Sequence, residues 1–192
     1  MKTITQHITE RLQLNKDRIR RYEYYPKTKE ELENIVDKIT LDHRNDKIID
    51  LNMIDTSEIT DMSELFVFDL YNYDISQWNV SNVKNMSFMF QGSSFNNDIS
   101  QWDVSQVETM NGMFMNSLFN KDISQWDVSK VKNMDIMFKF SKFNHDISDW
   151  DVSSVNQMSE IFDESQFNKD LTPWKNKIKN KKQLINIEKY IK

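Results

Sequence analysis

The chain has 192 residues, a net charge of −5 at pH 7, 12% aromatic residues and no cysteine. The aromatic content argues against a disordered chain, and the lack of cysteine excludes disulfides and thiolate metal sites. No stretch of the sequence reaches the roughly 18 apolar residues that a membrane-spanning helix needs, so we expect no membrane span.

The first 46 residues predict helices rather than repeats. Apolar residues in the segment 4–14 have the spacing of a short amphipathic helix. Further on, Thr28 and Glu31 have the spacing of a capping box ahead of apolar residues at helical intervals, which predicts a helix over residues 28–41. We expect residues 1–46 to form a helical N-terminal cap.

The rest of the chain is dominated by a repeated unit. The copy at residues 95–118 reads FNNDISQWDVSQVETMNGMFMNSL, and close copies occupy residues 71–94, 119–142 and 143–166. Residues 54–66 fit as a degenerate first copy. Tryptophan recurs every 24 residues, at Trp78, Trp102, Trp126, Trp150 and Trp174. A period of this length is typical of units that bury their apolar faces by stacking on one another.

Each copy contains an I-x-x-W-x-V frame, equivalent to the L-x-x-L-x-L frame of leucine-rich repeats. The spacing of Trp102 and Val104 predicts a short strand centred on Asp103, from which both apolar side chains point inward. The apolar residues from Val107 to Phe114 have the spacing of a short helix or 3-10 turn.

The expected fold class is therefore an α/β repeat, a leucine-rich-repeat-like solenoid with one short parallel strand and one short helix or 3-10 turn per 24-residue coil. We expect a single domain. Its solenoid of about five and a half coils spans residues 47–174, between the helical cap at 1–46 and a second helical cap at 175–192. Such caps shield the open ends of a repeat stack.

The pattern F-N-x-D-I-S-x-W-D-V-S-x-V-x-x-M-x-x-M-F resembles the BspA-like leucine-rich repeats of bacterial surface proteins, in the form found in mycoplasma lipoproteins. Small members carried by bacteriophages are also similar. The resemblance covers about residues 47–174. It implies a leucine-rich-repeat-like solenoid that binds proteins or host surfaces, and it implies no catalytic residues.

Two columns of polar residues, one on each side of the repeated tryptophan, form the candidate partner-binding site. On a leucine-rich-repeat architecture the exposed sheet face is the usual ligand surface, and a column of carboxylates favours a basic protein partner. The alternative is that each Asp only caps the turn that follows it. The candidate residues are Gln77, Asn79, Gln101, Asp103, Gln125, Asp127, Asp149 and Asp151.

A second acidic column precedes the repeated Ile or Leu of the frame. We expect these residues to close backbone turns, with divalent-ion binding as the weaker alternative, because calcium-binding β-rolls use glycine-rich turns and this chain has two glycines. We therefore expect no metal and no cofactor. The column consists of Asp50, Asp74, Asp98, Asp122, Asp146 and Asp170.

The repeated methionines and phenylalanines are expected to fill the core, whereas four apolar residues fall outside the repeated frame. If exposed, these four would form a site for a partner or for self-association; the alternative is that they pack under the caps. They are Phe68, Phe88, Met115 and Phe140.

The expected function is that of a non-catalytic protein-binding module with a rigid acidic and polar face. One alternative is a structural or assembly component, for example of a phage particle, that uses the solenoid edges and the apolar residues off the frame. A remote alternative is a glycoside hydrolase, because paired carboxylates such as Asp127, Asp149 and Asp151 can cleave glycosidic bonds. We expect no enzyme activity, since the carboxylates come from a repeated position without an insertion that would form a pocket. The three histidines are also far apart in sequence, at His7, His43 and His145.

The charge distribution limits the kind of partner. Residues 71–166 carry six basic and thirteen acidic side chains, whereas residues 167–192 carry eight lysines and two acidic residues. Nucleic acid is not expected on the repeats, because phosphate binding needs clustered Lys and Arg. The first 25 residues lack the apolar core of a signal peptide and a lipobox cysteine. We therefore expect a location in the cytoplasm, in a virion or in the host cytoplasm rather than on the cell surface.

Overall fold

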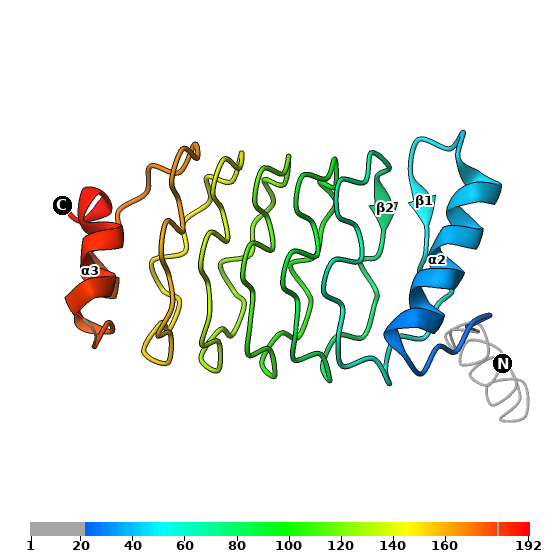
Figure 1. Ribbon diagram of the computed structural model, residues 1–192, viewed down its shortest axis with the longest axis horizontal. Helices are drawn as coiled ribbons and strands as arrows, with labels where there is room; N and C mark the ends of the chain where they lie inside the picture. The colour runs from blue at the N-terminus through cyan, green and yellow to red at the C-terminus, as the bar shows by residue number, and fades with distance from the viewer. Residues whose placement is uncertain (1–21, 180) are drawn as a thin grey trace, which may run out of the picture.

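The computed structural model describes residues 22–179 and 181–192, in which successive coils lie side by side along the long axis of the molecule (Figure 1). The helix predicted at residues 4–14 lies outside these ranges. Helix α2 (Lys29–His43) covers the N-terminal end of the stack, and helix α3 (Lys181–Ile187) covers the C-terminal end (Figure 1).

Helix α2 spans Lys29–His43 and begins directly after its N-cap, Thr28, whose hydroxyl accepts a hydrogen bond from Glu31 N–H at 3.2 Å. The Glu31 carboxylate accepts from Lys27 N–H, one residue earlier than the capping box predicts. The helix buries its apolar face against the first coil, and Lys29 Nζ donates to Ser63 Oγ at 3.0 Å. The buried residues of this face are Leu32, Val36 and Ile39.

Two short strands, β1 (Ile49–Asp50) and β2 (Tyr73–Asp74), pair in parallel with a register of 24 residues. In the described part of the chain, the later coils carry no strand at the position centred on Asp103, where the sequence predicts one. Their parallel bridges occur further along each coil and join Asp61, Asn85, Thr109, Asn133 and Gln157 in succession.

The strand is missing because the backbone turns twice in this part of the coil. Residues 98–105 and their counterparts in the other coils form a segment that we call the polar arc. The Oδ1 atom of Asp98 accepts from Ser100 N–H at 2.9 Å, and Asp103 Oδ1 accepts from Ser105 N–H at 3.1 Å. These side-chain bonds to the backbone two residues ahead favour turns over an extended ladder.

Residues 108–118 and their counterparts form a second segment, the turn strip, in which N–H groups alternate between two directions. Met110 N–H donates to Asn133 O in the next coil at 2.9 Å, whereas Met113 N–H donates back to Met110 O at 3.2 Å. The short helix or 3-10 turn predicted here is therefore a series of turns, because every second amide joins neighbouring coils instead of extending a helix. The other residues of this strip that donate to the next coil are Gly112, Phe114 and Asn116.

Two positions of the turn strip have positive φ in each coil. Gly92 and Gly112 occupy one of these positions each, with φ of 66° and 59°. The remaining positions hold residues with side chains at φ between 50° and 61°, a backbone region that costs an L-residue roughly 1–2 kcal/mol. They are Glu64, Phe68, Phe88, Asn116, Ile136, Phe140, Glu160 and Glu164.

The core consists of aromatic ladders that run along the stack. Trp102 stacks on Trp126 with ring centroids 6.5 Å apart, and Phe90 stacks on Phe114 at 5.5 Å. Each indole N–H also finds a buried carbonyl: Trp102 Nε1 donates to Ile75 O at 3.1 Å. The tryptophan therefore fills the core and satisfies a backbone group of the preceding coil.

The C-terminal end is covered by a 3-10 helix η1 (Thr172–Asn176), helix α3 (Lys181–Ile187) and a second 3-10 helix η2 (Glu188–Tyr190). Lys177 Nζ donates to the carbonyls of Ser148, Asp149 and Trp150 at 3.2, 3.0 and 2.9 Å. A single ammonium group thus bonds three backbone acceptors of the last full coil, at the position where a further coil would continue the stack.

Candidate functional site

The eight residues predicted to bind a partner all lie on the polar arc, and all are exposed. We call this set the polar face. The buried tryptophan of each coil lies between the exposed residues of the two columns. The members are Gln77, Asn79, Gln101, Asp103, Gln125, Asp127, Asp149 and Asp151.

The Asp and Asn column caps the turn that follows it in every coil. Asp127 Oδ1 accepts from Ser129 N–H at 3.0 Å, and Asp151 Oδ1 accepts from Ser153 N–H at the same distance. Asn79 makes the same bond to Ser81 N–H, at 3.1 Å, with a neutral side chain. The capping role considered from the sequence is therefore present. The capping bond uses one oxygen of each carboxylate, and the second oxygen can accept a further hydrogen bond.

Hydrogen bonds favour the ionised form of two of these carboxyl groups, those of Asp127 and Asp151. The side-chain and backbone donors of Ser129 lower the pKa of Asp127, an effect opposed by the nearby charge of Asp151. The backbone and side-chain donors of Ser153 likewise lower the pKa of Asp151, with help from Lys177. Both carboxylates are therefore negatively charged at neutral pH.

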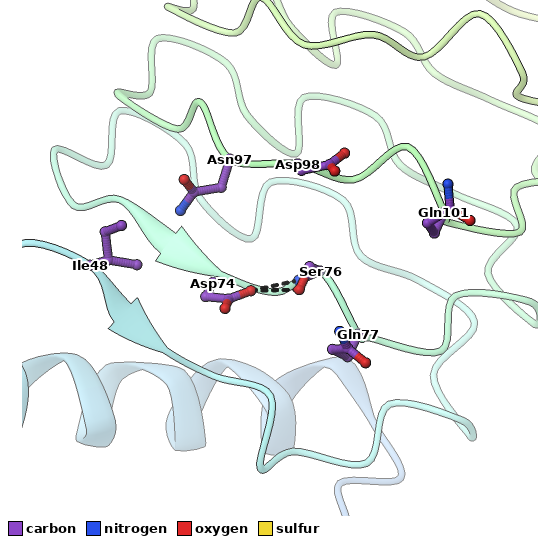
Figure 2. A pocket seen from close by; sticks show the side chains of 7 residues that line it. All are labelled: Ile48, Asp74, Ser76, Gln77, Asn97, Asp98 and Gln101. Carbon is purple, nitrogen blue, oxygen red and sulfur yellow. Dashed lines mark hydrogen bonds between the residues drawn. The ribbon is translucent and has the colours of Figure 1, made fainter.

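Two residues of the glutamine column, Gln77 and Gln101, line an open hollow of about 490 Å³ on the first coils (Figure 2). Figure 2 shows Gln77 and Gln101 projecting from neighbouring coils, with Asp74 bonded to Ser76 beside them. Gln101 Nε2 also donates to Ser100 Oγ at 3.3 Å. The hollow is thus lined by amides, hydroxyls and carboxylates and is open to solvent.

Sequence reasoning missed three residues of this hollow, Ile48, Ser76 and Asn97. Ile48 is 45% exposed and belongs to the chain that enters the first coil, so the repeat pattern gives no signal for it. Asn97 donates through Nδ2 to Tyr73 O at 2.7 Å and has a counterpart in each copy that differs in type, which hides it from a search for columns.

The second acidic column closes turns, as the sequence predicts. Asp122 Oδ1 accepts from Ser124 N–H at 2.9 Å, and Asp146 Oδ1 accepts from Ser148 N–H at the same distance. In the described ranges, no group of three or more His, Asp or Glu side chains is placed to hold a metal ion.

The residues considered for catalysis do not converge on one centre. His43 Nδ1 lies 2.9 Å from Asp46 Oδ2, and His145 Nε2 lies 3.2 Å from Asn120 O, in separate parts of the molecule. His7 lies outside the described residues. The backbone carbonyl of Asp149 accepts a hydrogen bond from Lys177 Nζ.

No helix within the described residues is long and apolar enough to cross a membrane.

The four apolar residues outside the frame divide into two pairs. Phe68 and Phe140 are 63% and 46% exposed. Phe88 and Met115 are half-buried, and the Phe88 ring lies against Gly112 of the next coil. Two further exposed apolar residues, Leu41 and Ile185, belong to the caps and not to the repeats, so the repeated frame carries no signal for them.

The chain was compared with known protein families, curated proteins and solved structures. A family model described as "Mycoplasma protein of unknown function, DUF285" matches the chain over residues 31–139 and again over residues 115–190. No curated protein and no solved structure matches.

Proposed function

The chain belongs to the Mycoplasma protein family DUF285, and we propose that it acts as a non-catalytic protein-binding module whose polar face engages a basic surface of a protein partner. The coils would form a solenoid of the leucine-rich-repeat kind, related to the BspA-like repeats. Its setting would be the cytoplasm or a phage particle.

The observation that carries this proposal is the regular, exposed and charged arrangement of the polar face. The capping bonds fix each carboxylate on the backbone of its own coil, so the side chains lose little conformational entropy when a partner binds. Rigid presentation of charge favours affinity and selects partners of opposite charge.

The test uses a natural difference between the copies, because position 79 holds Asn where the three later copies hold Asp. Asn79 shows that asparagine makes the capping bond without charge. The triple variant Asp103→Asn, Asp127→Asn, Asp151→Asn therefore removes three charges and preserves the turns. We expect an unchanged melting temperature and loss of partners that the wild-type chain captures from a mycoplasma lysate.

The matched control removes three acidic charges from the turn strip instead, with Glu108→Gln, Asp135→Asn and Glu160→Gln. This variant has the same net charge as the first, so retention of the partner by the control assigns binding to the polar face and not to overall charge. Equal capture by all three proteins would show that the Asp column only caps turns and would refute the proposal.

A further inference from the structure

We propose that copies of this chain associate head to tail, with the acidic N-terminal end of one copy docked on the basic C-terminal end of the next. The two ends lie at opposite extremes of the long axis (Figure 1). Residues 29–70 carry twelve acidic and four basic side chains, a net charge of −8, and residues 167–192 carry eight lysines and two acidic side chains, a net charge of +6. This inference does not use the polar face.

The N-terminal end presents the outer face of α2. Because Leu32, Val36 and Ile39 face the first coil, the opposite side of the helix faces solvent. On that side Leu41 is 64% exposed, and the exposed acidic residues Asp37 and Asp42 lie on the same end of the helix. An apolar side chain among carboxylates is thus available to a partner with an apolar recess and basic surroundings.

The C-terminal end offers such a recess. A hollow of about 410 Å³ is lined by Leu184, Ile185 and Ile191 together with Lys175 and Glu188. Ile185 is 71% exposed there. Aliphatic side chains beside a lysine at one end match an exposed leucine beside carboxylates at the other, both in polarity and in charge.

When unlike ends bind each other, an open assembly keeps one unoccupied acidic end and one unoccupied basic end. Such a heterologous contact continues into an open chain of copies unless the rotation between them closes a ring. The expected product is therefore a series of oligomers whose length grows with protein concentration and shrinks with salt, since screening weakens attraction between exposed charges.

The first test measures the oligomeric state of the full chain by sedimentation velocity over a range of concentrations. An N-end variant, Asp37→Lys with Asp42→Lys, should raise the dissociation constant about tenfold or more. A C-end variant, Lys175→Glu with Lys179→Glu, reverses two exposed lysines, one within η1 and one between η1 and α3, and should have the same effect. Mixing the two variants in equal amounts should restore association, because the unmodified acidic end of one meets the unmodified basic end of the other.

The apolar contribution is tested by Leu41→Ser, which should also weaken association. Its control is Leu118→Ser, which removes a half-exposed leucine from the middle of the stack and should leave association unchanged.

Three results would overturn the inference. A wild-type chain that is monomeric at every concentration would show that the two ends do not bind each other. Association that survives both charge reversals would place the interface elsewhere. Reversal variants that dissociate but are not restored by mixing would show that the acidic end of one copy does not dock on the basic end of the next.

Discussion

The polar arc and the turn strip belong to the same coils but differ in what determines their backbone. The arc is almost identical in four copies, reading DISQWNVS, DISQWDVS, DISQWDVS and DISDWDVS from residue 74 onward. The centre of the strip varies widely, reading ELFVF, FMFQG, GMFMN, IMFKF and EIFDE at residues 64–68, 88–92, 112–116, 136–140 and 160–164.

The hydrogen bonds explain this difference. In the arc, side chains make the bonds that shape the backbone: two carboxylates close turns, and the indole N–H bonds a carbonyl of the preceding coil, as in Trp126 to Ile99 O at 3.2 Å. In the strip, main-chain groups bond to main-chain groups of the next coil, so any side chain that fits the outer surface is compatible with the structure. Residue identity is restricted where side chains determine the backbone conformation.

The largest effect on the free energy of unfolding is expected at a tryptophan of the polar arc. Trp126→Ala removes a stacked core side chain and leaves Ile99 O without its donor, so we expect a loss of about 3–5 kcal/mol in the free energy of unfolding. Truncating an exposed residue of the turn strip, as in Glu108→Ala, should change the free energy of unfolding by less than about 0.5 kcal/mol. Urea denaturation of both variants measures the contrast, and similar losses for the two would contradict it.

A smaller loss of stability is expected at Gly112, where a side chain of the turn strip packs against the backbone of the next coil. A Cβ added at Gly112 would collide with the Phe88 ring and would also adopt positive φ. Gly112→Ala should therefore cost about 2 kcal/mol. In the Phe88→Ala background the same substitution should cost about half as much, because only the backbone strain remains. A double-mutant cycle by denaturation gives the coupling, and a coupling near zero would show that the ring moves aside freely.

The capping role of the arc is tested by comparing two substitutions at one site. Asp127→Ala loses the acceptor for Ser129 N–H and should destabilise by about 1 kcal/mol, whereas Asp127→Asn should be nearly neutral at pH 7 because Asn79 makes the same bond. If both substitutions destabilise equally, the charge and not the capping bond is what the turn requires.

The same site predicts a dependence on pH. The donors of Ser129 lower the pKa of Asp127 in the folded state below the unfolded value of about 3.9. This ionisation therefore contributes stability that is present above pH ~4 and is lost as pH falls through the folded pKa. The wild-type chain should lose more stability than Asp127→Asn on acidification below pH ~4, which thermal melts across that range will show.

The sequence predicts much of this architecture because its period is explicit. The 24-residue register, the inward-pointing tryptophans and the capping side chains Asp98 and Asp103 all follow from residue type and spacing. The position of the bridges between coils does not, because main-chain bonds leave little trace in side-chain identity. Positive φ is recognisable only at Gly92, Gly112 and Asn116, and the exposed apolar residues of the caps lie outside the repeat altogether.

The hidden backbone strain of the strip gives the last prediction, which has the smallest effect and the opposite sign. Glu64 is exposed and has a φ of 61°, so Glu64→Gly should relieve left-handed strain and raise the free energy of unfolding by about 0.5–1 kcal/mol. Glu58 is also exposed in the first coil but does not have positive φ. There the same change should lower stability by about 0.5–1 kcal/mol, since glycine only adds freedom to the unfolded chain. Urea denaturation measures both changes in the free energy of unfolding. A gain at Glu64 and a loss at Glu58 would locate the strain in the turn strip. A loss at both sites would show that hydrogen bonds between coils do not hold Glu64 in an unfavourable conformation.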